Sequence, residues 1–373
     1  MQAGAFILSV LLAAAPQDMP PPIEVVPAGP VERQILQWQP GAVTCGDSGD
    51  PGASLAATTM VTPYMQTISS QTPPREITLS FDIAADGRAF NIRPTGTQHL
   101  RFDTRDIMPS LRASRFASGV VQRGCRVTYT PMLQPLAKAD VPTLARFGAI
   151  PRHRLDAAGW QQIAPGNCRE RPRAAPLLRA YPDRRKLAMR EGERSWSYVR
   201  YDIDAEGQPV NLATAMSSGD AALDAEVRSA AAQGRYAGGP RTGCGLLWWT
   251  PPAIIAAPPI PAGSDKDGNT ACEIPDRWAR EPVLTYPEFY RQRAIEGWAV
   301  VRYDVATWGD IGEIKVLAAE PSSEFGEAAV NVLRRARFKP LANGLTGCVD
   351  RVRFTIRDGE GDASPAEDGP AAD

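Results

Sequence analysis

The sequence predicts an α+β protein made of three repeated small two-layer units, each an antiparallel β-sheet with helices packed on one face. Two observations predict this class. Six cysteines fall into three pairs of nearly equal spacing, and the same succession of strand, turn, strand and helix patterns recurs between the members of each pair. A period of this kind is typical of repeat architectures.

The N-terminal residues predict export. Residues 3–15 form one uncharged apolar run of 13 residues. A membrane-spanning helix needs about 20 residues, whereas this length fits the apolar core of a signal peptide. The alanines at 13–15 before Pro16 resemble a cleavage site. We expect residues 1–15 to be a signal peptide, with an uncleaved N-terminal membrane anchor as the alternative.

The cysteines predict one disulfide in each unit. An even number of cysteines favours disulfides in an oxidising compartment, and no CxxC spacing supports a zinc or thioredoxin-type site. The pairs are 80, 76 and 76 positions apart, and a glycine precedes the second cysteine each time. The repeat selects one of the fifteen possible connectivities. The expected bonds are Cys45–Cys125, Cys168–Cys244 and Cys272–Cys348.

Alternating apolar and polar residues predict the first strand of each unit. These strands are residues 77–83, 199–203 and 299–305. A turn that contains glycine follows each of them and leads to a return strand, which predicts a hairpin because glycine accepts the positive φ of such turns. The turn glycines are Gly87, Gly207 and Gly309, and the return strands carry Ile92, Leu212 and Ile314.

A helix that ends at an aromatic residue follows each hairpin. Residues 324–338 place Phe325, Ala329 and Leu333 at helical spacing in the third unit, whereas Pro109 interrupts the pattern in the first. The helix-end aromatics are Phe116, Tyr236 and Phe338. They lie 120 and 102 positions apart, as the turn glycines do. A last strand then begins near the second cysteine of each unit.

Proline-rich and polar segments bound the units. We expect a Pro-rich leader at 16–40, a linker with room for a short helix at 132–167, a Pro-rich linker at 251–267 and a disordered acidic tail at 358–373. The units between them are residues 41–131, 168–250 and 268–357.

Composition excludes several classes of function. The 373 residues carry 41 Lys and Arg against 42 Asp and Glu, so no bulk charge favours nucleic acid or an acidic membrane. The only histidines are His99 and His153, too few for a His-based metal site or catalytic triad. Asp82, Asp202 and Asp304 share one slot before the turns, which favours solvation or salt bridges over acid–base chemistry. We expect no enzyme, no cofactor and no metal.

The third unit resembles the C-terminal domain of TonB, the bacterial energy transducer. Residues 286–340 match a family pattern that runs from a Tyr-Pro start to an Arg-Phe-Lys-Pro end. The matching residues are Tyr286-Pro287, Glu296-Gly297, Gly309, Pro321-Ser322 and Arg337-Phe338-Lys339-Pro340. The second unit keeps Tyr181-Pro182, Glu191-Gly192 and Glu206-Gly207, and the first keeps the hairpin and Arg115-Phe116. The chain thus resembles three divergent copies, of which the third is the clearest.

The resemblance implies a binding domain in the periplasm and a site on it. In this family, the last strand of the sheet pairs with the TonB box, a short peptide of an outer-membrane transporter, by strand addition. Here that strand is residues 348–357. The residues expected to bind a peptide are Val349, Arg351, Arg353 and Thr355. The two arginines would suit a peptide with acidic character.

Two functions remain open. The apolar N-terminal run is short and the cysteine pairs are not part of the family pattern, so a soluble periplasmic relative is favoured over an energised transducer. Such a relative binds a protein or extended peptide, with the TonB box as candidate, in TonB-dependent outer-membrane transport. Alternatively, it is an envelope structural or adaptor protein whose repeats act as spacer or assembly units without energy transduction. A free or a covered edge on the last strand of the third unit distinguishes the two.

Overall fold

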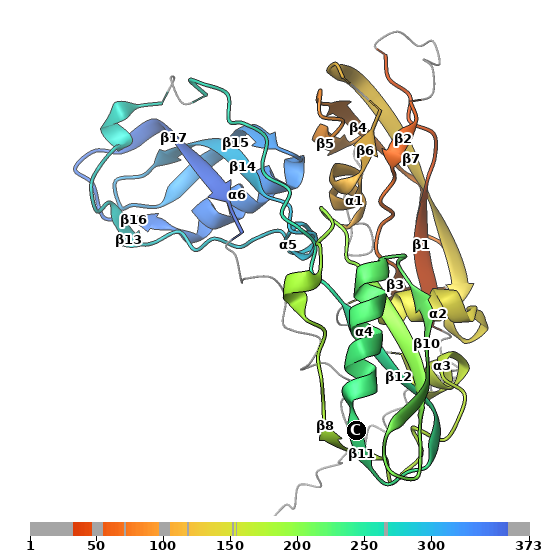
Figure 1. The fold of residues 1–373 in the computed structure, drawn as a ribbon. Helices are drawn as coiled ribbons and strands as arrows, with labels where there is room; N and C mark the ends of the chain where they lie inside the picture. Colours follow the sequence, from red (N-terminus) through yellow and green to blue (C-terminus); the bar gives the residue numbers. More distant parts are fainter. Residues whose placement is uncertain are drawn as a thin grey trace, which may run out of the picture. The chain divides into compact units, whose positions relative to one another are not determined.

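The computed structural model describes residues 33–46, 55–70, 72–96, 105–117, 119–150, 153, 155–264 and 268–356. The predicted signal peptide, most of the predicted leader, the predicted tail and His99 lie outside these residues. All described residues fall within one compact unit of the chain. It is a mixed α/β structure with antiparallel sheets and a few short helices (Figure 1).

The first sheet region, residues 33–138, contains a five-stranded antiparallel sheet of order β3-β1-β7-β4-β5. Its elements are β1 (Gln34–Pro40), β2 (Ala57–Thr59), β3 (Gln66–Ile68), β4 (Ile77–Ile83), β5 (Ala89–Pro94), α1 (Ile107–Ala113), β6 (Arg115–Phe116), β7 (Gln122–Pro135) and the 3₁₀ helix η2 (Leu136–Lys138). The helix α1 begins at Ile107, so Pro109 lies in its first turn, where no backbone N–H is needed.

A helical segment joins the first and second sheets. It contains α2 (Val141–Gly148) and α3 (Ala157–Ile163), where the sequence predicted a linker with room for one short helix. Both helices begin at aspartate caps: Asp140 accepts from the Thr143 N–H at 2.9 Å and Asp156 from the Gly159 N–H at 2.8 Å. Their apolar faces form a buried cluster that includes Ile35 of β1.

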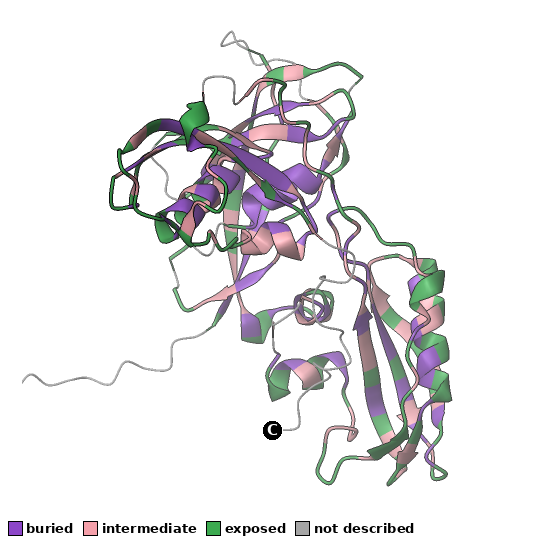
Figure 2. Cartoon of the chain, turned by 90° about the vertical axis from the view of Figure 1, so that its left-hand side faces the viewer, coloured by how far each residue is buried: buried purple, intermediate pink, exposed green. Residues whose placement is uncertain are grey.

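The second sheet region, residues 168–250, has a three-stranded sheet of order β10-β9-β12. Its elements are β8 (Ala175–Leu178), η3 (Arg184–Lys186), β9 (Trp196–Ile203), β10 (Pro209–Ser217), α4 (Ala221–Gln233), β11 (Arg235–Ala237) and β12 (Arg241–Trp249). Helix α4 packs on β9 and β10 through the buried Leu223, Val227, Ala230 and Ala231, while its opposite face is exposed (Figure 2).

The third sheet region, residues 268–356, has a three-stranded sheet of order β15-β14-β17 with α6 on one face (Figure 1). Its elements are η4 (Thr270–Cys272), β13 (Trp278–Arg280), α5 (Glu288–Gln292), β14 (Gly297–Val305), β15 (Ile311–Glu320), α6 (Ser323–Arg335), β16 (Arg337–Phe338) and β17 (Leu345–Phe354). One buried cluster contains Phe325, Phe338 and Tyr303 of this region together with Leu36 and Phe81 of the first.

The hairpin turns of the three regions share one local geometry. Gly87, Gly207 and Gly309 have φ of 82°, 79° and 94°. A Cβ atom on each would come within 2.3, 1.9 and 2.1 Å of the carbonyl oxygen of the helix-end aromatic, so only glycine fits. The aromatic N–H in turn donates to the glycine carbonyl at 2.9 Å in all three regions. The predicted turns thus hold the helix end against the hairpin.

The last strand of each region is tied to its central strand by an aspartate. Asp82, Asp202 and Asp304 accept from the N–H groups of Gly124, Gly243 and Gly347 at 3.0, 2.9 and 2.7 Å. These glycines precede the second cysteine of each pair. The expectation of solvated or salt-bridged aspartates therefore missed their main role, although Arg123 also lies 3.4 Å from Asp82.

The three predicted disulfides are confirmed. They join Cys45 to Cys125, Cys168 to Cys244 and Cys272 to Cys348, and no described cysteine is left unpaired.

The assignment of residues 34–40 to the extended leader is wrong. They form strand β1, which pairs with the C-terminal half of β7. Leu36 and Trp38 of this strand are 0% and 3% exposed. Three prolines at 20–22 and others nearby suggested a leader, but the apolar side chains at 35, 36 and 38 gain more by burial in the first sheet.

Candidate peptide-binding edge of strand β17

The candidate site is the outer edge of β17. This strand pairs with β14 in the register Gly297↔Phe354 to Val305↔Leu345, and β14 is the central strand of the sheet. Within the residues that the structure describes, no strand pairs with the opposite side of β17. An edge of this kind offers a row of backbone donors and acceptors.

The predicted site residues lie together on one face of this strand. Val349, Arg351 and Arg353 alternate with residues of the opposite face of the strand, and Thr355 follows directly after the strand ends. Arg351, Arg353 and Thr355 are exposed, whereas Val349 is half-buried. Side chains of β14 lie beside them, since Arg351 pairs with Val300.

The backbone groups of the same residues point away from the sheet. The Asn269 N–H donates to the Gly347 carbonyl at 3.0 Å from outside β17, whereas the Ile356 N–H donates to Glu296, next to β14, at 3.0 Å. Because backbone groups alternate in direction along a strand, even-numbered residues here face β14 and odd-numbered residues face outward. The N–H and C=O groups of Val349, Arg351 and Arg353 therefore line the outer edge.

The start of this edge is covered by η4. The Asn269 side chain donates to the Thr346 carbonyl at 2.9 Å, in addition to its backbone bond to Gly347. The Cys272–Cys348 disulfide holds this contact in place. In the part of the chain that the structure describes, the stretch of this edge without a neighbouring strand or 3₁₀ helix thus begins at Val349.

The opposite face of β17 is fixed by polar and aromatic contacts. Asp350 accepts from Arg277 at 2.7 Å and from the Tyr303 hydroxyl at 2.8 Å. Burial, together with the Asp350 charge, raises the pKa of Tyr303, so this hydroxyl remains a donor at neutral pH. At the other end, the Phe354 ring lies 5.2 Å from Phe325, centroid to centroid. These contacts hold β17 in place on the sheet.

The Tyr-Pro and Glu-Gly motifs shape the same end of the strand. The Tyr286 hydroxyl donates to the Ile295 carbonyl at 2.7 Å, and its ring meets Phe354 edge-on. A Cβ atom at Gly297 would lie 2.5 Å from the Phe325 ring, so glycine is needed there. Tyr286 and Gly297, two of the motif residues, are therefore packing residues around the end of β17.

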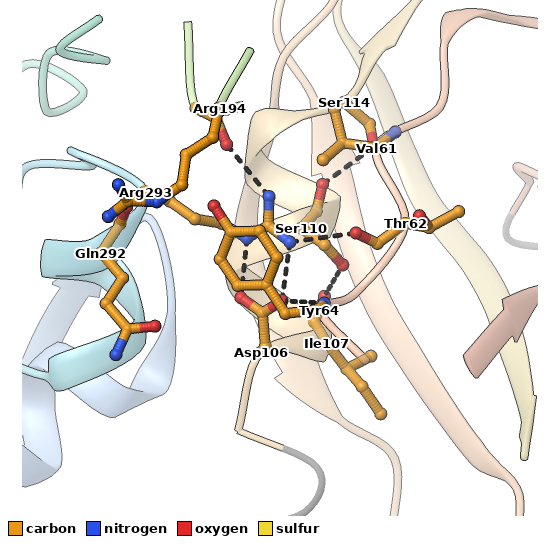
Figure 3. A network of polar contacts seen from close by, with 11 residues as sticks. Val61, Thr62, Tyr64, Asp106, Ile107, Ser110, Ser114, Arg194, Gln292 and Arg293 are labelled. Atoms are coloured by element: carbon orange, nitrogen blue, oxygen red, sulfur yellow. Dashed lines mark hydrogen bonds and ion pairs between the residues drawn. The ribbon is translucent and has the colours of Figure 1, made fainter. Parts of the chain in front are cut away.

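A buried ion pair links this region to the first. Arg293, between α5 and β14, and Asp106, before α1, are each 1% exposed, and the two guanidinium–carboxylate distances are both 2.6 Å (Figure 3). Arg293 also donates to the carbonyls of Gly192 and Thr62 at 3.0 Å, and Tyr64 stacks against it at 4.0 Å. A single guanidinium thus contacts all three sheet regions.

The Arg293 charge is stable in this setting. Burial alone would lower the pKa of Arg293, but Asp106 beside it raises that pKa above its ordinary value, so the guanidinium stays protonated. Neither residue is among those that the sequence predicted to be functional. Neither belongs to a repeated slot or to a family motif, and 187 positions separate them, so no local pattern pointed to the pair.

In the described part of the chain, no helix is both long and apolar enough to cross a membrane.

The residues that end the chain's described part form a small α/β domain, and no described strand pairs with the outer edge of its last strand. The comparisons identify the domain: residues 282–357 match the family described as Gram-negative bacterial TonB protein C-terminal. The chain therefore carries a TonB C-terminal domain, as the motifs predicted. Among solved structures, it is similar to the solution NMR structure of the Pseudomonas aeruginosa TonB C-terminal domain, with 24% identity, 23% of this chain and 91% of that chain covered, and a TM-score of 0.21. No curated protein matches the chain.

Proposed function

We propose that this chain is a periplasmic, non-enzymatic protein that binds an extended peptide by strand addition along β17, in connection with TonB-dependent outer-membrane transport. The observation that carries the proposal is the outer edge of β17, toward which the backbone groups of Val349 and Arg353 face and along which the described residues place no further strand. The TonB C-terminal family match at 282–357 supports a role in protein binding linked to transport.

Backbone pairing supplies the affinity of such a site. Each outward residue offers one donor and one acceptor, and a net gain of about 0.5–1.5 kcal/mol per hydrogen bond is usual. The exposed arginines at 351 and 353 add specificity, because a peptide strand beside β17 brings alternate side chains to their face. An acidic peptide is the preferred ligand.

We further propose that the three sheet regions are divergent copies of one unit. Each has a central strand between its return strand and its last strand, a disulfide to the last strand, a positive-φ turn glycine and an aspartate that accepts from the last strand. The positive-φ residues Asn91, Asn211 and Glu313 of the return strands follow the same 120 and 102 offsets. In this scheme the third unit binds and the other two support it.

The test is peptide binding to the whole mature chain with two variants at one position. Arg353→Pro removes the outward N–H, whereas the matched control Arg353→Ala keeps it and removes the side chain. We expect about tenfold weaker binding of an acidic extended peptide to the proline variant than to the alanine variant. Hydrogen exchange followed by mass spectrometry should show new protection at 348–356 in the wild type on peptide addition.

The alternative function predicts a different result. An envelope spacer or adaptor would need the three regions held rigidly together, and the buried Arg293–Asp106 pair favours such rigidity. If transporter-derived peptides neither bind nor protect residues 348–356, while all variants stay folded by thermal unfolding, the spacer function is the better account and the strand-addition proposal is wrong.

A further inference from the structure

The last strand of the first region already has a strand on its outer edge. Strand β1 pairs with β7 in the antiparallel register Gln34↔Pro135 to Pro40↔Tyr129, on the side opposite to β4. The pairing continues beyond β1: the Gly41 N–H donates to the Thr128 carbonyl at 2.8 Å. Residues 34–44 thus form a continuous cover for the edge of β7.

The final contact in this cover is a pair of backbone hydrogen bonds. Thr44 and Arg126 donate to each other's carbonyls at 3.1 and 2.8 Å. Arg126 follows Cys125 as Val349 follows Cys348, so the outward residues of β7 hold the same places as the outward residues of β17. The edge that is open in the third region is therefore filled in the first.

The covering strand is anchored by side chains and by a covalent bond. Leu36 and Trp38 are buried in the core that contains Tyr129 of β7, and Ile35 is buried in the cluster with α2 and α3. Directly after the strand, Cys45 bonds to Cys125 at the start of the covered edge. Three buried apolar side chains and one tether hold residues 34–44 in place.

The chain that precedes the first cysteine of the other two regions takes a different path. In the second region, Asn167 accepts from the Thr242 N–H at 2.8 Å, and Cys168 donates to the Thr242 carbonyl at 3.0 Å. In the third, Asn269 covers only residues 346 and 347. Within the described ranges, neither β12 nor β17 has a strand along the rest of its outer edge.

We propose that residues 34–44 are a built-in strand ligand of the first region. This region is a strand-accepting site that the chain fills with its own segment, locked by the Cys45–Cys125 disulfide. Its ligand class is an extended segment with apolar side chains at alternate positions, as at Leu36 and Trp38. The inference rests on the proposed function only in extending strand addition to a second edge, and it leaves β17 as the edge open to an external peptide.

The experiment opens this site in the full mature chain. A protease site is inserted within residues 47–54 of a variant that carries Cys45→Ser and Cys125→Ser, and the purified protein is cut. A fluorescent synthetic peptide of residues 33–46 with serine at 45 is then added in excess. We expect the labelled peptide to replace the cut fragment with one peptide per protein, as measured by fluorescence after gel filtration.

Two controls define the site. The same cut protein with its disulfide intact should take up the peptide at least tenfold more slowly, because the tether retains the fragment. A peptide with Leu36→Asp and Trp38→Asp should bind at least tenfold more weakly, because it lacks both anchors. If the fragment leaves and the protein unfolds, refolding on addition of the wild-type peptide, followed by circular dichroism, supports the proposal.

Two outcomes would overturn the proposal. One is a cut protein that stays folded without the fragment and takes up no labelled peptide, and the other is an unfolded cut protein that the peptide does not rescue. In parallel, the binding of an acidic extended peptide at β17 is compared between the uncut chain and its Arg353→Pro variant. Failure at β7 alone rejects this inference, and failure at β17 alone rejects the proposed function.

Discussion

Strands β7 and β17 occupy equivalent places in their sheets, yet their outer edges differ. Each contains, near its start, a glycine-cysteine pair whose cysteine is bonded to an upstream cysteine, and each pairs with the central strand of its hairpin. The edge of β7 is covered by residues 34–44, whereas among the described residues only the start of the β17 edge is seen to be covered, by Asn269. The availability of a strand edge is thus decided by the residues before the first cysteine and not by the sheet that carries it.

Strand length follows the same difference. β7 runs for 14 residues and β17 for 10. The additional residues of β7, up to Pro135, pair with β1 and not with β4, so they need the covering strand to satisfy their backbone groups. An edge that is always filled can extend beyond its own hairpin, whereas an open edge stays short, as edge strands do.

Removal of single disulfides is the largest perturbation that separates the two edges. The loops closed by Cys45–Cys125 and Cys272–Cys348 span 80 and 76 positions, so loss of either should lower the free energy of unfolding by about 4–5 kcal/mol. The measurement is urea unfolding of the two double-serine variants. Only the first variant should also show faster hydrogen exchange in residues 34–44. Equal exchange of that segment in both would contradict the role of the tether.

The buried ion pair tests whether the two edges belong to one cooperative body. Asp106→Ala leaves the Arg293 charge without its partner in a dry site and should cost about 3–5 kcal/mol in unfolding free energy. We expect calorimetry to show one transition in the wild type and separate transitions for the first and third regions in the variant.

The control for this prediction removes both charges. Asp106→Asn combined with Arg293→Met leaves no unpaired ion and should recover most of the lost stability. A double variant as unstable as Asp106→Ala would mean that packing at this site, and not charge, holds the regions together.

Sequence patterns predicted what is local and repeated. The hairpins, the helix-end aromatics, the disulfides and the TonB C-terminal domain were all predicted correctly, because each leaves a periodic or motif signal within one unit. The role of residues 34–40 as a sheet strand was missed because the pairing partner lies about 95 positions away in β7 and prolines dominate the preceding residues. The Arg293–Asp106 pair was missed for the same reason.

A buried histidine gives the segment beside the first edge a pH dependence. His153 stacks on Phe147 of α2, at 4.5 Å between ring centroids, in the helical segment that packs against Ile35 of β1. Burial lowers the pKa of His153 to about 4, so the folded state disfavours the charged form. In the unfolded chain the same group takes a proton near pH 6.5. The contribution of the neutral His153 to the stability of the fold is therefore fully present above pH 6.5 and is lost as the pH falls toward 4.

Over this window, the unfolding free energy of the wild type should fall relative to that of His153→Phe by about 1.4 kcal/mol per pH unit. Phenylalanine keeps the stacking on Phe147 and cannot be protonated. The comparison therefore separates the effect of His153 from that of the carboxylates, which titrate at similar pH in both proteins. The measurement is urea unfolding between pH 4 and 7. Parallel stability curves for the two proteins would show that His153 does not contribute.

The smallest effects are expected at the open edge itself. Arg351 and Arg353 are exposed, so Arg351→Ala and Arg353→Ala should each change the unfolding free energy by less than about 0.5 kcal/mol. An exposed charge pair contributes about 0.2–1 kcal/mol, so each substitution should weaken the binding of an acidic peptide only about two- to fivefold. Because salt screens exposed charges, 0.5 M salt should remove most of this difference between the variants and the wild type. Arg126→Ala on the covered edge of β7 is the matched control and should leave binding unchanged. The affinity for the acidic peptide is measured by isothermal titration calorimetry at low and high salt. If Arg126→Ala and Arg351→Ala weaken the affinity equally, the acidic side chains do not bind at β17.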